Sequence, residues 1–268
     1  QQKAPHSRSF LPRSSDGKWK WYRLFMKDKM PLNFYRIDGE HNLDQPLLHE
    51  WISAPVCDFF GAVLGFPVFH SYSPTFHQKF FARYQMAFYA IAIQSSERDL
   101  ALKILAQIGM KCAAITAPLK EEGINTLYVN QDGTHKTLNT DLIALKECLK
   151  KYHFFEPIAI WGNGEMAQNI KKIYPDALIY SARQGAKDLG NAKTLIWACG
   201  NHPEYKFPES SYELSTLFDL SYIPWSMGKD FAFNHGLKYI SGEELFILQA
   251  QEQQKFWQSC IEKNTRGK

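Results

Sequence analysis

The sequence predicts an α/β fold that is divided into two domains. At 268 residues, the chain is longer than the ~100–150 residues of a typical single domain. From about Ala62 onward, strand-like apolar runs alternate with helical segments, which is the pattern of parallel sheets covered by helices. The segment "FFEP" (154–157) is the expected domain boundary, because Pro157 cannot continue the helix before it. The alternation of strands and helices restarts after it.

These changes of pattern set the expected boundaries. We expect an irregular extension over 1–56, a first domain over 57–153 and a second domain over 154–241. A final helix over 242–262 is expected to pack back onto the first domain. Within the extension, "WKWYRLFM" and "LNFYRI" are predicted to be strands and "DQPLLHEWI" a short helix.

The first domain is expected to hold three strands, a hairpin and three helices. The strands are "AVLGFPVF", "MAFYAIAI" and "CAAIT". The hairpin is "NTLYVNQDGTHKTL", with Asp132-Gly133 as its turn. Helices are expected from Ser73, over "SSERDLALKILAQIGM" and from about Thr140. Ser96 and Asp99 have the spacing of a capping box at the start of the second helix.

Two hydroxyls, Ser71 and Ser73, stand where the first strand gives way to a helix. Ser73 can be the N-cap, with Pro74 in the first turn, where a missing N–H costs nothing. That explanation does not require Ser71, which lies on the same side of an extended chain. The alternative is that both hydroxyls bind an oxygen-rich ligand. The local sequence favours neither reading over the other.

The second domain begins with a strand, a glycine-rich turn and a helix in "IAIWGNGEMAQNIKKIY". Further strands are predicted at "ALIYSAR", "TLIWACG" and "LFDLSY". The last helix runs through "SGEELFILQAQEQQKFW", where Ser241 and Glu244 have capping-box spacing.

The glycine-rich turn reads G-x-G-x-x-A, with Gly162, Asn163, Gly164 and Ala167. Glycines after a strand allow backbone N–H groups to approach a pyrophosphate at the positive end of the next helix. An acidic residue at the end of the second strand would bind the ribose of NAD. This chain has Ser181 and Arg183 there. A hydroxyl and a cation suit a 2′-phosphate, so the sequence favours NADP over NAD.

Composition excludes several classes of protein. The net charge is +4, from 31 basic and 27 acidic residues without a basic block, so we expect no nucleic-acid partner. No apolar run reaches the ~18 residues of a membrane span. The chain starts Gln-Gln-Lys without Met or an apolar targeting segment, so we expect the trimmed or processed remainder of a longer chain. The cysteines form no CxxC pair and are expected to be reduced thiols of a cytoplasmic protein, with no metal site: Cys57, Cys112, Cys148, Cys199 and Cys260.

Polar residues gather at the expected carboxyl ends of the first-domain strands, where α/β sheets bind ligands. They are Thr116, Lys120, Asn125, Asn139, Thr140 and Asp141. Each also has a structural explanation: Lys120 can be a surface lysine and Asp141 a first-turn acid favoured by the helix dipole.

In order along the chain, "GFPVFHSYSP", "ITAPLK", "NTL", "NTD", "GNGEMA" and "DLSYIP…GEELFILQ" resemble the motifs of the shikimate dehydrogenase family over about 62–268. The resemblance implies an N-terminal α/β substrate domain and a C-terminal Rossmann-like dinucleotide-binding domain. It implies reversible, NADP-dependent reduction of 3-dehydroshikimate to shikimate on the route to chorismate and the aromatic amino acids. It further implies that Lys120 and Asp141 are the catalytic pair and that Gly242 lies beside the nicotinamide. The implied substrate-binding residues are Ser71, Ser73, Thr116, Asn125, Tyr222 and Gln249.

The residue types suit this chemistry. Oxidising a secondary alcohol requires departure of a hydride to the nicotinamide and loss of the hydroxyl proton. A lysine near the hydroxyl can relay that proton, and a carboxylate can orient it. The sequence leaves open whether Lys120 or Asp141 accepts the proton.

The chain departs from the family pattern at several positions. Ala114 replaces an asparagine, Leu142 replaces a glycine, and Ser-Ala-Arg at 181–183 replaces Asn-Arg-Thr. Only Glu121–Ile124 separate Lys120 from Asn125, where the family has a much longer segment. Either a helix is missing beside the site, or the chain omits residues.

Two alternatives therefore remain: a quinate or other polyol dehydrogenase of the same family, and an inactive paralogue that only binds a ligand. Retention of both Lys120 and Asp141 favours an active enzyme. In the extension, "NFYRIDGEHNLDQPLLHEW" loosely resembles the end of a type I dehydroquinate dehydratase. That resemblance implies a dehydratase domain fused to or docked with this chain, although no dehydratase active site can be assigned within 1–56.

Overall fold

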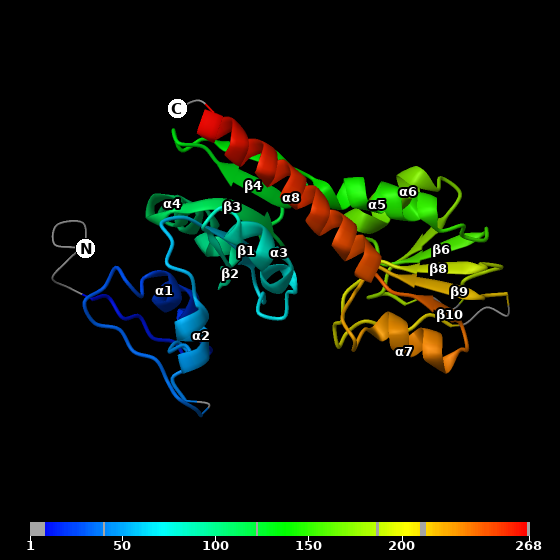
Figure 1. The fold of residues 1–268 in the computed structure, drawn as a ribbon. Coiled ribbons are helices and arrows are strands. Elements are labelled where there is room, and N and C mark those ends of the chain that lie inside the picture. The colour runs from blue at the N-terminus through cyan, green and yellow to red at the C-terminus, as the bar shows by residue number, and fades with distance from the viewer. Residues whose placement is uncertain (1–8, 40, 122, 186–187, 210–212, 267–268) are drawn as a thin grey trace. The chain divides into compact units, whose positions relative to one another are not determined.

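The structure, a computed structural model, describes residues 9–39, 41–121, 123–185, 188–209 and 213–266. Its internal contacts divide the chain into two compact units. The first unit runs to Asn139 and resumes at Gln253, and the second covers Thr140–Glu252. The dividing point lies ahead of the one expected at 153–154, because the helix that starts at Thr140 is grouped with the second unit. Figure 1 shows the elements of each unit.

The first unit is built on a five-stranded sheet with the order β2-β1-β3-β4-β5. β1 pairs in parallel with β2 and β3, and the β4–β5 hairpin continues the sheet in the antiparallel direction. Its elements are α1 (Lys20–Phe25), α2 (Leu48–Ser53), β1 (Phe60–Gly65), α3 (Ser73–Ala82), β2 (Ala87–Ala92), the 3₁₀ turn η1 (Ser95–Glu97), α4 (Arg98–Ile108), β3 (Met110–Ile115), β4 (Thr126–Val129) and β5 (His135–Leu138).

Alternation along β1 separates two apolar cores, since successive side chains of a strand point to opposite faces. Phe60 and Leu64 belong to the core that includes α1 and α4. Val63 belongs to the core that includes α3 and Trp257 of the last helix. All three β1 side chains are buried, so both faces of this sheet are covered.

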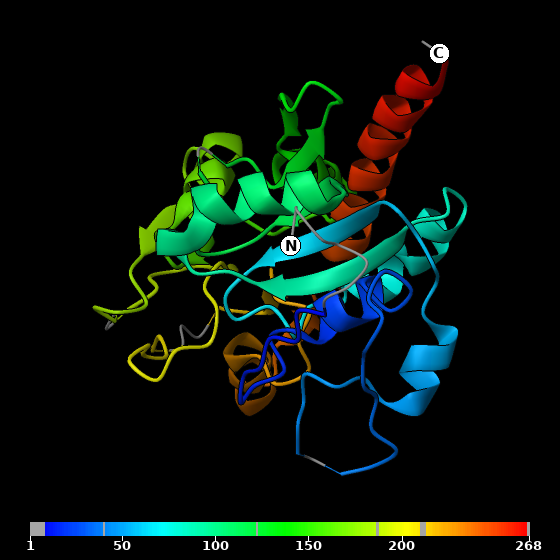
Figure 2. The ribbon, with the colours of Figure 1, turned by 90° about the vertical axis from the view of Figure 1, so that its left-hand side faces the viewer.

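The extension differs from its expected structure. "WKWYRLFM" forms the helix α1 and not a strand, and "LNFYRI" contributes only an isolated bridge between Arg36 and Leu47. The reason is packing: Trp21 and Phe25 lie one helical turn apart, and their ring centroids are 5.7 and 4.6 Å from that of Phe60. In a strand the two side chains would also share a face but would lie about 13 Å apart, too far for both to contact the one Phe60 ring. Figure 2 shows the blue extension beside the strands of this sheet. The predicted helix in "DQPLLHEWI" is confirmed as α2.

The other first-unit elements agree with the sequence except at two helix starts. α4 is preceded by η1, and the contact of capping-box type joins the Gln94 N–H to the Glu97 carboxylate at 3.0 Å. The predicted pair of Ser96 and Asp99 is therefore wrong. α3 is the second exception and belongs to the site described below.

The second unit is an entirely parallel five-stranded sheet with the order β10-β9-β8-β6-β7. The core on one face includes α5 and α6 and that on the other includes α7. Its elements are α5 (Thr140–Lys151), β6 (Ile158–Trp161), α6 (Glu165–Ile173), β7 (Leu178–Tyr180), β8 (Thr194–Trp197), β9 (Thr216–Asp219), α7 (Met227–Asn234), β10 (Lys238–Ile240) and the start of α8 (Glu243–Arg266). The sequence did not predict α7 or β10.

The last helix, α8, has 24 residues and belongs to both units. Leu245 is buried in the second unit, and Trp257 and Cys260 are buried in the first. The capping box predicted at its start forms only in part: the Ser241 hydroxyl accepts the Glu243 N–H at 3.4 Å. Glu244 instead accepts hydrogen bonds from Lys151 and Tyr152. Among the described helices, none is long and apolar enough to cross a membrane.

Replacing Trp257 with alanine is expected to destabilise the first unit by about 3–5 kcal/mol. The indole is fully buried, and its Nε1–H donates to the Leu127 carbonyl at 3.0 Å. Urea unfolding of the variant measures this loss. Trp225→Ala, at a side chain that is 62% exposed, is the control and should lose less than about 1 kcal/mol. Similar losses in the two variants would contradict the assignment of Trp257 to the core.

Candidate functional site

The polar residues expected in the first unit lie on segments that meet at one edge of its sheet. The carboxyl ends of β1 and β3 share an edge because the strands are parallel, and β4 starts there because it is antiparallel. The loops after β1 and β3 are joined by a hydrogen bond from the Phe66 N–H to the Ala117 carbonyl at 3.0 Å. A Cβ at Gly65 would lie 2.4 Å from Cγ2 of Thr116. Glycine at 65 thus allows the Thr116 loop to lie against β1.

Ser71 and Ser73 have different local roles from those predicted. Ser73 is the first residue of α3 and not its N-cap. The Ser71 hydroxyl oxygen accepts the Ser73 N–H at 3.2 Å, so Ser71 is the residue that caps this turn. Accepting that bond leaves the Ser71 O–H able to donate to an anion. Ser71 is half-buried and Ser73 is buried.

The short connection between Lys120 and Asn125 is a compact turn. The Ile124 N–H donates to the Glu121 carbonyl at 2.9 Å, and Gly123 has a φ of +75°. After the turn, the Asn125 carbonyl accepts the Ile115 N–H at 2.7 Å. Lys120 and Asn125 thus follow β3 and precede β4 at the same edge, and none of the described residues between them (121, 123 and 124) is helical.

In the second unit, Gln249 of α8 lies at the start of α5. Its amide Nε2 donates to the buried Thr140 hydroxyl at 3.3 Å. Asp141 is the next residue, half-buried in the first turn of α5. Two of the predicted site residues, Gln249 and Asp141, therefore lie close together. Lys120 belongs to the first unit.

The glycine-rich turn lies at the topological switch point of the parallel sheet. The strand order reverses between β6 and β8, and ligands of open α/β sheets bind in the crevice at such a point. Gly162 has a φ of +121°, and a Cβ there would lie 2.7 Å from the Ala198 carbonyl oxygen that follows β8. Gly164 caps α6, and no atom lies within 4 Å of where its Cβ would be.

This geometry fits a dinucleotide. Open space at Gly164 and the free N–H groups at the start of α6 are what a pyrophosphate requires. Asn163 lies between the two glycines and is exposed. Glu165, the first residue of α6, is also exposed and adds a negative charge beside this position.

The turn after β7 carries Ser181 and Arg183. The Ser181 hydroxyl accepts the Gln184 N–H at 3.5 Å. Arg183 is exposed, and among the described residues no hydrogen bond or ion pair occupies its guanidinium. Lys206, which the sequence did not single out, lies against the same turn: its N–H donates to the Ala182 carbonyl at 2.9 Å. The Lys206 ammonium donates to the Gln184 carbonyl at 3.5 Å, so both cations lie at the turn that follows β7.

Gly242 and Tyr222 lie in the loops that follow β10 and β9. A Cβ at Gly242 would lie 2.3 Å from the Leu220 carbonyl oxygen, and its N–H donates to the Ser221 carbonyl at 3.0 Å. Tyr222 packs against Phe246 with ring centroids 4.6 Å apart. Gly242 thus has a structural requirement of its own, which is close contact between two backbones.

Asp219 is a residue of this region that sequence reasoning missed. It ends β9, is fully buried, and accepts hydrogen bonds from Ser226, from the Ser221 N–H and from Tyr239. Burial raises the pKa of its carboxyl, which these hydrogen bonds partly oppose. The sequence signal for this residue was an aspartate at the end of an apolar run, with the α7 N-cap Ser226 shortly after it.

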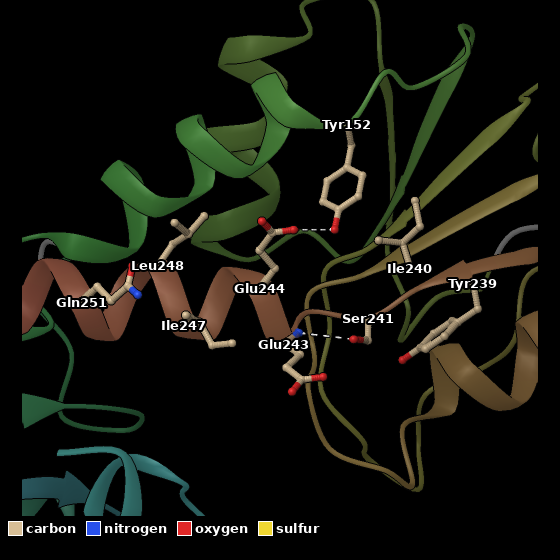
Figure 3. Close-up of a pocket in the computed structure, with 9 residues that line it drawn as sticks. All are labelled: Tyr152, Tyr239, Ile240, Ser241, Glu243, Glu244, Ile247, Leu248 and Gln251. Carbon is tan, nitrogen blue, oxygen red and sulfur yellow. Dashed lines mark hydrogen bonds between the residues drawn. The ribbon is translucent and has the colours of Figure 1, made fainter. Parts of the chain in front are cut away.

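A surface pocket of about 690 Å³ lies beside Gly242, lined by Tyr152, Tyr239–Ser241, Glu243, Glu244, Ile247, Leu248 and Gln251. Figure 3 shows the Glu244 carboxylate bonded to the Tyr152 hydroxyl. Hydrogen bonds from Lys151 and Tyr152 lower the pKa of Glu244, and the bond to Glu244 raises the pKa of Tyr152 to about 12. These groups bind one another, and no predicted site residue lines the pocket. We therefore assign it a structural role.

The cysteines are unpaired, as expected, and four of the five are buried. Within the part of the chain that the structure describes, no three His, Cys, Asp or Glu side chains are grouped as a metal site would need.

The structure is thus a two-part α/β protein: a mixed five-stranded sheet with polar strand ends, followed by a parallel sheet with a glycine-rich switch point. Residues 63–139 match the family model described as the shikimate dehydrogenase substrate binding domain. Over these residues the chain is similar to the substrate-binding domain of shikimate dehydrogenases.

Its relatives include enzymes and proteins named only for their likeness to them. A shikimate dehydrogenase-like protein of Haemophilus influenzae is 25% identical over 230 residues, 68% of this chain and 84% of the relative. A shikimate dehydrogenase (NADP(+)) of Paramagnetospirillum magneticum is 28% identical over 156 residues, 50% of this chain and 56% of the relative. Among solved structures, a shikimate 5-dehydrogenase of Thermus thermophilus in complex with NADP(H) and shikimate has a TM-score of 0.57 at 20% identity. That alignment covers 74% of this chain and 93% of the other.

Gly162→Ala is expected to destabilise the protein more than Gly190→Ala. Both glycines have positive φ, but a Cβ at Gly190 meets nothing within 4 Å, whereas one at Gly162 lies 2.7 Å from a backbone oxygen. Gly190→Ala should cost only the ~1–2 kcal/mol of backbone strain, and Gly162→Ala should add the cost of separating β6 from β8. Urea unfolding midpoints measure both. Equal losses would show that the two strand ends do not depend on this close approach.

Proposed function

We propose that the protein is an NADP-dependent shikimate dehydrogenase that interconverts 3-dehydroshikimate and shikimate. The observation that carries the proposal is the match of 63–139 to the substrate-binding domain together with Lys120, Asn125 and Asp141 at strand and helix ends. The Paramagnetospirillum relative is named for NADP(+), and the Thermus structure holds NADP(H) and shikimate. Both names support the choice of cofactor and substrate.

Each proposed residue has a role that its chemistry allows. The carboxylate and hydroxyls of the substrate would be bound by Ser71, Ser73, Thr116, Asn125, Tyr222 and Gln249. Lys120 and Asp141 would hold the reacting hydroxyl and move its proton. NADP, when bound, supplies or accepts the hydride. The backbone contacts to NADP would come from Gly162, Asn163, Gly164 and Gly242. Its 2′-phosphate would be bound by Ser181 and Arg183.

A quinate dehydrogenase is the second candidate, because Ala114 replaces the family's asparagine. Ala114 is buried in β3, in the core that includes α3 and Trp257. An alanine there removes an amide from beside the substrate edge, and a smaller side chain allows a different ring substituent. The preference between the two substrates is therefore part of the test.

A dehydratase fused to or docked with this chain is a separate proposal. It rests on the resemblance in "NFYRIDGEHNLDQPLLHEW" alone. Packing of α1 against the first sheet gives part of the extension a structural function that needs no second enzyme.

The function is tested by following absorbance of the reduced nicotinamide with shikimate or quinate and with NADP⁺ or NAD⁺. We expect turnover with shikimate and NADP⁺ to exceed that of the other three combinations. Turnover chiefly with quinate would select the second candidate. Binding of shikimate without turnover in all four reactions would identify an inactive paralogue.

Lys120→Ala is expected to lower kcat by about 10²–10⁴-fold while shikimate still binds, because proton relay acts only in the transition state. Steady-state kinetics and shikimate binding by calorimetry measure the two effects. Lys103→Ala, at an exposed lysine of α4, is the matched control and should leave both unchanged. Near-normal kcat in Lys120→Ala would remove this lysine from the mechanism.

Arg183→Ala is expected to raise the KM for NADP⁺ by about ten- to a hundredfold, since a charge-assisted hydrogen bond to phosphate is worth ~1.5–3 kcal/mol. The KM for NAD⁺ should not change, because NAD⁺ has no 2′-phosphate. Lys172→Ala, which removes an exposed cation of α6, controls for general charge. If Arg183→Ala affects the two cofactors equally, the residue does not bind the phosphate.

A further inference from the structure

A chain of polar side chains runs through the apolar core between α3 and α8. His77 of α3 is fully buried, with ring centroids 4.9 Å from Phe88 and 5.0 Å from Trp257. Gln253 and Gln254 of α8 contact its two ring nitrogens at 3.2 and 3.1 Å. Because the surrounding rings are apolar, burial lowers the pKa of His77 to about 4. The imidazole is therefore neutral near pH 7 and carries one N–H.

The hydrogen-bond directions in this chain are fixed by its last member. The Gln253 Nε2 lies 3.3 Å from the backbone carbonyl oxygen of Asn125. A carbonyl oxygen can only accept a hydrogen bond, so this end of the Gln253 amide is its NH₂ group. Its Oε1 then faces His77 and accepts from Nε2–H. Nδ1 must accept from the Gln254 amide. The order is thus Gln254 to His77 to Gln253 to Asn125, and every member is satisfied.

Two members of this hydrogen-bonded series, Asn125 and His77, lie on segments of the proposed substrate site. Asn125 is 2% exposed, and its side-chain Oδ1 accepts from the Thr126 hydroxyl at 3.0 Å. His77 lies one helical turn after Ser73, at the start of α3. Burying a series of polar side chains costs free energy of desolvation that apolar side chains would avoid. When every group in the series is hydrogen-bonded, however, it favours a single arrangement of the segments that it joins. Here that arrangement fixes Asn125 and the start of α3 relative to one another.

We propose that Gln253, Gln254 and His77 are positioning residues that orient Asn125 toward bound substrate. This inference rests on the proposed function, in which Asn125 binds a substrate hydroxyl. Gln253 is the central member, because it contacts both His77 and Asn125. Its loss should therefore weaken binding of the substrate and leave the cofactor site of the second unit unchanged.

The test compares Gln253→Met with Gln258→Met. Methionine keeps the length of glutamine without its hydrogen bonds, and Gln258 is exposed on the same helix. In Gln253→Met we expect the KM for shikimate to rise about 5- to 30-fold, with the KM for NADP⁺ within twofold of the parent. Gln258→Met should match the parent in both. An equal rise of both constants, or a lower Tm with an unchanged KM for shikimate, would show that the chain is only structural.

Histidine-labelled NMR tests the chain itself, independently of activity. In the parent, His77 is expected to be the neutral Nε2–H tautomer down to about pH 5. In Gln253→Met the Nε2 chemical shift should move. A different tautomer in the parent would overturn the proposed directions. If the parent neither turns over nor binds shikimate, the proposed function fails and the positioning role fails with it; if the parent is active and Gln253→Met keeps its KM, only the positioning role fails.

Discussion

Close contact between backbones at strand ends is the constraint on which the rest of this molecule depends. It recurs at Gly65, Gly162 and Gly242, where a Cβ would lie 2.7, 2.7 and 2.3 Å from a backbone oxygen. Real Cβ contacts are not this short, so any other residue would force the segments apart. Gly65 ends β1, Gly162 directly follows β6, and Gly242 lies in the loop after β10. In each sheet, the loops that would bind ligands are therefore held close to the neighbouring backbone by these glycines.

The loops that carry the polar side chains at the strand ends are held firmly in place. Polar side chains can hold a substrate only if the backbone that carries them does not move with each contact. Thr116 packs where Gly65 lacks a side chain, and the turn between Lys120 and Asn125 contains only four residues. A short turn leaves few conformations to the lysine backbone.

Most of the fold could be predicted because its strands and helices have clear periodicity and glycine or proline boundaries. The strand-turn-helix around Gly162 and the hairpin at Asp132-Gly133 follow from local rules. The failures share a different cause. α1 is a helix because Trp21 and Phe25 meet Phe60 from a distant strand, and a sequence window does not contain that partner. The caps at Ser71 and Gln94 were misplaced by two residues for a related reason, since helix ends depend on small differences between competing polar groups.

For the site, residue types could be predicted better than their contacts. Glu244 shows why: its spacing from Ser241 fits a capping box, yet Lys151 and Tyr152 from another helix bind its carboxylate. A single hydrogen bond within the backbone turn is weaker than two contacts that include a cation. The same reasoning applies to Gln253, which the sequence presents as one glutamine among several in α8. Its importance comes from His77 and Asn125, which are far away along the chain and are brought together only by the fold. Glutamines are common on the exposed faces of helices. Only its buried hydrogen-bond partners, which the sequence does not reveal, mark Gln253 as a residue that holds one arrangement of the fold.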